Sequence, residues 1–135
     1  MIREDAPHLV CLNETKLLAP LRLDGYYSHQ TLAQRSGGCW TAGRHHLDLK
    51  LVKALSTYMC WTQAQVDGSP VHIINCYLEP GEAEKVRNQT LRILEVVKDL
   101  IQQDKTAHII VCGDFNKQLP HVTKELRKTG FAGVF

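Results

Sequence analysis

Polar side chains suited to phosphoryl chemistry follow three apolar runs of the sequence. A glutamate and an aspartate that lie near each other offer hard oxygen ligands, which suit Mg²⁺ or Mn²⁺. Asparagine and tyrosine side chains can donate hydrogen bonds to a phosphoryl oxygen. The sequence therefore favours a metal-assisted phosphoester site. The three polar segments are Asn13-Glu14-Thr15, Asn75-Cys76-Tyr77 and Gly113-Asp114-Phe115-Asn116.

This interpretation depends on the joint pattern, because each residue alone has a simpler explanation. An aspartate after glycine is typical of a turn, a glutamate after a strand is usually solvated, and a tyrosine at a strand end usually packs. If the three apolar runs are neighbouring strands of one sheet with the same direction, their polar ends meet at one edge. That edge is where α/β proteins commonly place their sites.

Hydrophobic periodicity predicts the elements that position these residues. From Glu82 to Gln103 the apolar residues recur at helical spacing, which predicts an amphipathic helix of about six turns. Asp67-Gly68-Ser69-Pro70 separates two β-rich runs and predicts a hairpin. The strands are expected at 8–12, 39–42, 57–66, 71–77 and 107–112, with a further strand suggested by alternating Leu47, Leu49 and Leu51, and a short helix at 123–128. This order favours an α/β or layered α+β fold.

Composition excludes several classes of protein. The 135 residues are 44% hydrophobic and 22% charged, which is typical of a globular domain and not of a disordered chain. The net charge of +2 excludes a histone-like electrostatic binder but permits an enzyme that contacts a few phosphates. No apolar run is long enough to cross a membrane, and the N-terminal residues have no signal-peptide core. Five cysteines without a C-x-x-C pair favour a reducing, intracellular location, in the nucleus or the cytoplasm.

Three segments together resemble the endonuclease/exonuclease/phosphatase superfamily. The segments are PHLVCLNETK at 7–16, VHIINCYLEPG at 71–81 and HIIVCGDFN at 108–116, with RSGGCWTAG at 35–43 as a fourth. The resemblance extends from about Ala6 to Asn116, and it lies nearest the non-LTR retrotransposon endonuclease branch. It implies a partial four-layer α/β-sandwich of the deoxyribonuclease-like type, in which helices flank mixed sheets. Residues 1–135 are then expected to be one domain that is incomplete at both ends.

The resemblance also implies a role for each candidate residue. Glu14 resembles the metal ligand, and Asp114 resembles the carboxylate that orients or deprotonates the attacking water. Asn116 and Tyr77 resemble the side chains that contact the scissile phosphate. The neighbouring lysines, Lys16 and Lys117, are expected to be substrate-binding residues or solvated surface charges. The implied cofactor is Mg²⁺ or Mn²⁺, and the implied partner is nucleic acid, DNA in particular.

Two parts of the family pattern are not found in the sequence. One is an N-terminal strand that carries an asparagine, and the other is a Ser-Asp-His segment near the C-terminus. No Asp-His pair occurs anywhere in the chain, and His121 lies too close to Asn116 to replace it. Weak or absent activity is therefore expected, together with self-association through exposed sheet surface. A phosphatase for a small phosphoester and a non-catalytic retroelement remnant or interaction module remain as alternatives.

Overall fold

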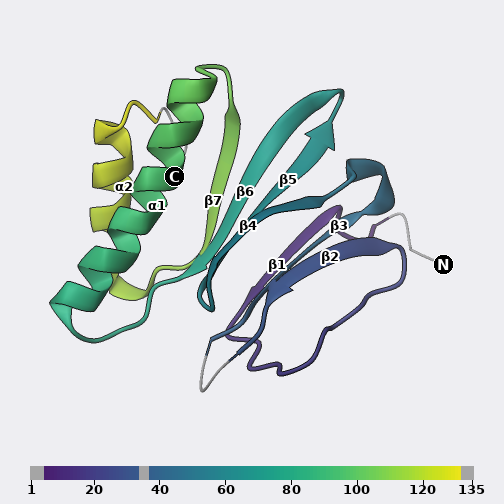
Figure 1. Ribbon diagram of the computed structural model, residues 1–135, viewed down its shortest axis with the longest axis horizontal. Coiled ribbons are helices and arrows are strands. Elements are labelled where there is room, and N and C mark those ends of the chain that lie inside the picture. Colours follow the sequence, from purple (N-terminus) through teal and green to yellow (C-terminus); the bar gives the residue numbers. More distant parts are fainter. Residues whose placement is uncertain (1–4, 34–36, 132–135) are drawn as a thin grey trace. The chain divides into compact units, whose positions relative to one another are not determined.

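The structure, a computed structural model, describes residues 5–33 and 37–131 (Figure 1). It divides into two compact units. The first contains the chain before Leu78 together with His108–Gly113, and the second contains Leu78–Ala107 and the chain from Asp114 onward. Arg35 and Ser36, which begin the fourth segment of the family resemblance, lie outside the described residues. Within the described part, no helix is both long and apolar enough to cross a bilayer.

The first unit contains an antiparallel sheet of three strands in the order β1-β3-β2. Its strands are β1 (Leu9–Asn13), β2 (Tyr26–Thr31) and β3 (Cys39–Arg44). Asn13, the last residue of β1, pairs with Cys39, the first residue of β3. The chain that follows β1 therefore leaves the sheet beside the Gly37–Gly38 segment that enters β3.

A second sheet of the same unit has four strands in the order β4-β5-β6-β7. The strands are β4 (Lys50–Ser56), β5 (Met59–Val66), β6 (Ser69–Tyr77) and β7 (His108–Asp114), and η1 (His45–Leu47) precedes β4. Asp67 and Gly68 both have positive φ, at 51° and 78°, and form the tight turn between β5 and β6. This is the conformation that Asp-Gly favours in a two-residue hairpin, so the predicted hairpin is confirmed.

The two sheets face each other, since β1 and β3 contact β6, and β2 and β3 contact β5. Part of the core between them is a cluster of Leu47, Leu49, Ala64 and Ile73, against which Leu9, Cys11, Val71 and Cys112 pack. All five cysteines are free thiols that are buried or half-buried. Thiols in such positions behave as small hydrophobic residues.

The second unit contains two α-helices and a short 3₁₀ turn. These elements are α1 (Ala83–Gln103), η2 (Asn116–Gln118) and α2 (Leu119–Lys128). The apolar spacing predicts a buried stripe at Val86, Thr90, Ile93, Leu94, Val97, Leu100 and Ile101. The buried face of α1 contains all of these except Ile101, which is half-buried, and adds Val96. Helix α2 starts four residues earlier than predicted, because Pro120 lies in its first turn, where the missing N–H is not needed. The α+β class and the long helix are thus confirmed.

Two local predictions need correction. Leu47 and Leu49 were expected to alternate within a strand, but Leu47 ends the 3₁₀ turn η1 and Leu49 precedes β4, so both reach the core from a bend in the chain. Strand β2 was not predicted, because YYSHQT shows no clear alternation of apolar and polar residues. Its position depends on pairing with β3, which is a long-range interaction.

Candidate functional site

Glu14 and Lys16 lie in the segment that follows β1, and both have left-handed backbone conformations, with φ of 49° and 54°. The N–H of Thr15 donates to the carbonyl of Gly38 at 3.2 Å, and the N–H of Lys16 donates to that of Gly37 at 3.0 Å. Gly38 itself has a φ of 91°, and a Cβ there would lie 2.5 Å from the Thr15 hydroxyl. The Gly-Gly pair is thus what allows this segment to dock, with the side chains of Glu14 and Lys16 exposed.

Tyr77 ends β6 and is mostly buried, with 8% of its surface exposed. Its N–H donates to the carbonyl of Tyr58 at 2.9 Å, and the two rings lie 6.0 Å apart. The residue before Tyr58, Thr57, accepts a hydrogen bond from the N–H of Gly38 at 2.8 Å. The turn between β4 and β5 therefore connects Tyr77 to the segment that carries Glu14 and Lys16, within the first unit.

A buried pair of asparagines makes a second connection at this end of the sheets. Asn13 donates from Nδ2 to Oδ1 of Asn75 at 2.6 Å. Asn75 is fully buried and donates in turn to the carbonyls of Leu12 and Trp40 and to the hydroxyl of Thr41. Asn13 immediately precedes Glu14, and Asn75 lies two residues before Tyr77. The pair positions two candidate residues, although the sequence indicated only that both asparagines lie at strand ends.

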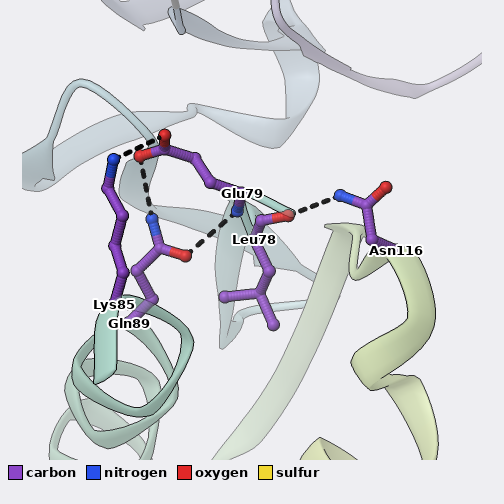
Figure 2. A network of polar contacts seen from close by, with 5 residues as sticks. All are labelled: Leu78, Glu79, Lys85, Gln89 and Asn116. Atoms are coloured by element: carbon purple, nitrogen blue, oxygen red, sulfur yellow. Dashed lines mark hydrogen bonds and ion pairs between the residues drawn. The ribbon is translucent and has the colours of Figure 1, made fainter. Parts of the chain in front are cut away.

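Asp114 and Asn116 form a compact turn at the end of β7. The N–H of Asn116 donates to Oδ1 of Asp114 at 2.9 Å, and the carbonyl of Asp114 accepts from the N–H of Leu78 at 2.8 Å. Figure 2 shows the carboxamide of Asn116, which donates from Nδ2 to the carbonyl of Leu78. Asn116 has a φ of 50°, which asparagine tolerates better than most residues. The side chains of Asp114, Asn116 and the following Lys117 are exposed.

Gly113, the residue before this turn, is required by the close approach of β7 to its neighbouring strand β6. Gly113 has a φ of 140°, and a Cβ at this position would lie 1.7 Å from the carbonyl oxygen of Cys76. No side chain fits at that distance. The glycine of Gly-Asp-Phe-Asn thus brings the end of β7 against the end of β6.

Glu79 takes part in a polar network that anchors the chain after β6 (Figure 2). Gln89 of α1 donates to Oε1 of Glu79 at 3.3 Å and accepts from its N–H at 3.0 Å. Lys85 makes an ion pair with Oε2 at 2.9 Å. Both carboxylate oxygens are therefore engaged, and Glu79 serves to anchor Leu78, the residue that Asn116 also contacts.

The six candidate residues fall into two sets. Glu14, Lys16 and Tyr77 belong to the first unit, and Asp114, Asn116 and Lys117 belong to the second. The condition for convergence, that the three polar strand ends share one sheet, is not met by β1, which lies in the three-stranded sheet, whereas β6 and β7 are neighbours in the other. Sheet membership depends on long-range pairing, and the apolar run at 8–12 carries no signal for it.

Backbone strain supplies an independent indication of a site. In the described part of the chain, five residues other than glycine have positive φ, and three of them are candidates: Glu14, Lys16 and Asn116. Such conformations cost free energy and concentrate at functional positions. The other two, Asp48 and Asp67, lie at the end of η1 and in a hairpin turn.

The available oxygen donors fit magnesium better than zinc. Among the described residues, no three His, Cys, Asp or Glu side chains lie close enough together to hold a metal alone. Magnesium is usually held by one or two carboxylates, with water and substrate phosphate as its other ligands, and does not need such a cluster. The exposed carboxylate of Glu14 fits that pattern, and no cysteine–histidine site for zinc is found in this part of the chain.

Comparison with known proteins finds similarity in structure only. No protein-family model and no curated protein matches the sequence. Among solved structures, the AP endonuclease LMAP from Leishmania major is 16% identical with a TM-score of 0.66, over 91% of this chain and 56% of its own. The endonuclease domain of TRAS1, a telomere-specific non-LTR retrotransposon, is 14% identical with a TM-score of 0.60, over 91% and 60%.

A third structure, D. rerio TDP2 complexed with a single-strand DNA product, is 18% identical with a TM-score of 0.56, over 95% of this chain and 54% of its own. The chain thus spans little more than half the length of these proteins. All three have the same arrangement of sheets and helices, and the match extends over nine-tenths or more of the present chain. The chain therefore shares its fold with these structures, and the deoxyribonuclease-like fold expected from the family resemblance is confirmed.

Proposed function

We propose that this chain is the core of a divalent-metal-dependent phosphodiesterase that hydrolyses nucleic acid, DNA in particular. The observation that carries the proposal is the Asp114–Asn116 turn, an exposed carboxylate and carboxamide held in fixed geometry at the end of β7. The fold supports it, because the similar structures are described as an AP endonuclease, a retrotransposon endonuclease domain and a complex with a DNA product.

Asp114 and Asn116 have the donors and acceptors that this reaction needs. One oxygen of Asp114 accepts the N–H of Asn116, which leaves Oδ2 to orient a water or take its proton. One N–H of the Asn116 carboxamide goes to Leu78, and the second remains for a phosphoryl oxygen. In this proposal Lys117 contacts an adjacent phosphate. Because the Asn116 side chain is already held, little ordering is needed when substrate binds.

The residues of the first unit take the remaining roles in the proposal. Glu14 holds the metal, Lys16 contacts phosphate, and Tyr77 donates from its hydroxyl to a phosphoryl oxygen. Mg²⁺ or Mn²⁺, when bound, would offset negative charge on the phosphoryl group and on the leaving oxygen. We infer that residues 1–135 act as a single domain. We expect slow hydrolysis, because the sequence contains no Asp-His pair.

The test is cleavage of abasic-site, plasmid and single-stranded DNA in Mg²⁺ or Mn²⁺, with and without Asp114→Asn. Loss of a positioned general base lowers the rate by about 10²- to 10⁴-fold, so cleavage should disappear. The matched control is Asp104→Asn, because Asp104 accepts the N–H of Thr106 at 2.8 Å in a similar exposed turn. Its cleavage rate should equal that of the wild type.

Two results would contradict this function. If no DNA substrate is cleaved at high protein concentration, the chain is not a nuclease in this form. If cleavage survives Asp114→Asn, the activity does not come from this turn. Hydrolysis of a small phosphate ester that depends on Asp114, without DNA cleavage, would instead select the phosphatase alternative.

A further inference from the structure

One face of α2, together with the 3₁₀ turn η2 before it, carries a row of basic side chains, which we call the basic stripe: Lys117, His121, Lys124 and Lys128. All four are exposed. His121, Lys124 and Lys128 are spaced by three and four residues, which places them on the same side of a helix. Lys117 lies one turn before them in η2. The stripe thus begins next to Asn116 and continues along the helix.

The opposite face of α2 is buried. Val122 and Leu126 are 1% and 2% exposed, and α2 contacts α1 within the second unit. At about 100° per residue, the stripe is centred on the far side of the helix from these two residues. Packing therefore fixes which side of α2 faces solvent, and the cations gather there because of the fold.

The charge of this segment differs from that of the whole chain. Residues 117–128 contain four lysines and arginines and one carboxylate, whereas the chain as a whole carries a net charge of only +2. The carboxylate is Glu125, which makes an ion pair with Lys128 at 3.0 Å. Its pKa is lowered mainly by the hydrogen bond from Lys128 and also by the nearby charges of His121 and Lys124. The cations therefore surround and outnumber the single acid.

We propose that the basic stripe binds the phosphate backbone of the nucleic-acid strand beside the bond that Asp114 and Asn116 act on. This inference rests on the proposed function, since it gives that site its substrate-holding surface. From His121 to Lys128 the helix rises by about 10 Å, a length of duplex axis that contains about three phosphates of each strand. A row of lysines of this kind reads no bases and contributes affinity and position.

Binding of DNA without catalysis tests the stripe independently of hydrolysis. Fluorescence anisotropy of a labelled DNA duplex in EDTA, over about 50 to 200 mM salt, gives the dependence of affinity on salt. Removing two phosphate contacts with Lys124→Gln/Lys128→Gln should reduce the slope of log affinity against log salt by about 1.8. Because both side chains are exposed, the variant should keep the wild-type circular dichroism spectrum.

Three further variants serve as controls. Lys98→Gln/Lys105→Gln removes the same charge from exposed positions of the second unit outside the stripe and should leave the slope unchanged. Lys124→Arg/Lys128→Arg keeps the charge and should keep the slope. Glu125→Gln releases Lys128 from its ion pair and should strengthen binding.

The inference is wrong if the wild type does not bind DNA, or if both glutamine double variants reduce the slope equally. It is also wrong if the stripe variant binds as the wild type does. If the stripe variant loses binding while the wild type binds but never cleaves, the stripe is established and the proposed hydrolysis alone fails.

Discussion

Asn13 donates from Nδ2 to Oδ1 of Asn75 at 2.6 Å, and this hydrogen bond joins the last residue of β1 to a strand of the other sheet. Because Asn75 is fully buried and its Nδ2 donates to the carbonyls of Leu12 and Trp40 and to the Thr41 hydroxyl, its carboxamide has a single orientation. The two strand ends that carry Glu14 and Tyr77 are thereby fixed to each other. This directional hydrogen bond inside the sandwich thus fixes the relative position of the two strand ends, which non-directional apolar packing cannot do.

Substituting Asn75 should destabilise the protein more than substituting its partner. Asn75→Ala leaves the carbonyls of Leu12 and Trp40 without this donor, whereas Asn13→Ala removes a half-buried side chain. We expect a loss of about 3 kcal/mol in the free energy of unfolding for Asn75→Ala and about 1 kcal/mol for Asn13→Ala. Urea denaturation measures both, and equal losses would contradict the assignment of Asn75 as the central residue.

Gly113→Ala should be far more damaging than the same change at Gly81. The two glycines have nearly the same φ, 140° and 138°, so the backbone strain of an alanine is matched. A Cβ at Gly113 would lie 1.7 Å from the Cys76 carbonyl oxygen, while nothing lies within 4 Å of one at Gly81. We expect Gly81→Ala to cost about 1–3 kcal/mol and Gly113→Ala to prevent cooperative folding. Thermal melting distinguishes them, and similar melting temperatures would disprove the close approach of β6 and β7.

Glu14→Gln should weaken the binding of Mg²⁺ and Mn²⁺. The change keeps the shape of the side chain but removes the hard anionic donor. The matched control is Glu84→Gln, an exposed glutamate in the first turn of α1, which should leave metal affinity unchanged. Calorimetric titration or Mn²⁺ paramagnetic resonance measures the affinity. If Glu14→Gln binds metal as tightly as the wild type, Glu14 is not a ligand.

The cysteines should react with iodoacetamide at very different rates near pH 8. A hydrogen bond from Cys112 lowers the pKa of Cys11, whereas burial raises the pKa of Cys39 to about 11 and that of Cys60 to about 12. Only thiolates react, so Cys11 should be alkylated first, and Cys39 and Cys60 should be protected until the chain unfolds. Mass spectrometry of peptides from a time course gives the order, and early labelling of Cys39 would contradict the burial.

Alkaline pH should destabilise the fold, because burial raises the pKa of these same thiols. Below pH 9.0, the ordinary value, Cys39 keeps its proton in both the folded and the unfolded states, and its contribution to stability is complete. Between about pH 9 and 11 the unfolded chain releases the proton while the folded protein retains it, so the free energy of unfolding falls as pH rises. Cys39→Ala should flatten this decline in denaturation curves. An unchanged pH dependence in the variant would exclude Cys39 as its source.

Local patterns predicted the elements with strong periodicity and failed where position depends on distant partners. The helix α1 and the β5–β6 hairpin follow from spacing and turn chemistry alone. The sequence also placed the polar segment 113–116 at the end of a strand, as the structure has it. It could not identify β2, the sheet to which β1 belongs, or the Asn13–Asn75 pair, because each depends on partners outside the local segment. The left-handed backbone at Glu14 and Lys16 likewise depends on the docking of Gly37 and Gly38.

The left-handed backbone of Glu14, Lys16 and Asn116 restricts which substitutions these positions tolerate, whatever the chemistry. Valine, isoleucine and threonine crowd this conformation, whereas glycine and asparagine accept it. In a library of variants selected only for folding, β-branched residues should therefore be depleted at positions 14, 16 and 116. Loss of function on substitution at these positions can therefore come from backbone strain as well as from the missing catalytic side chain. Glycine variants relieve the strain but lack the side chain, so they separate these two causes.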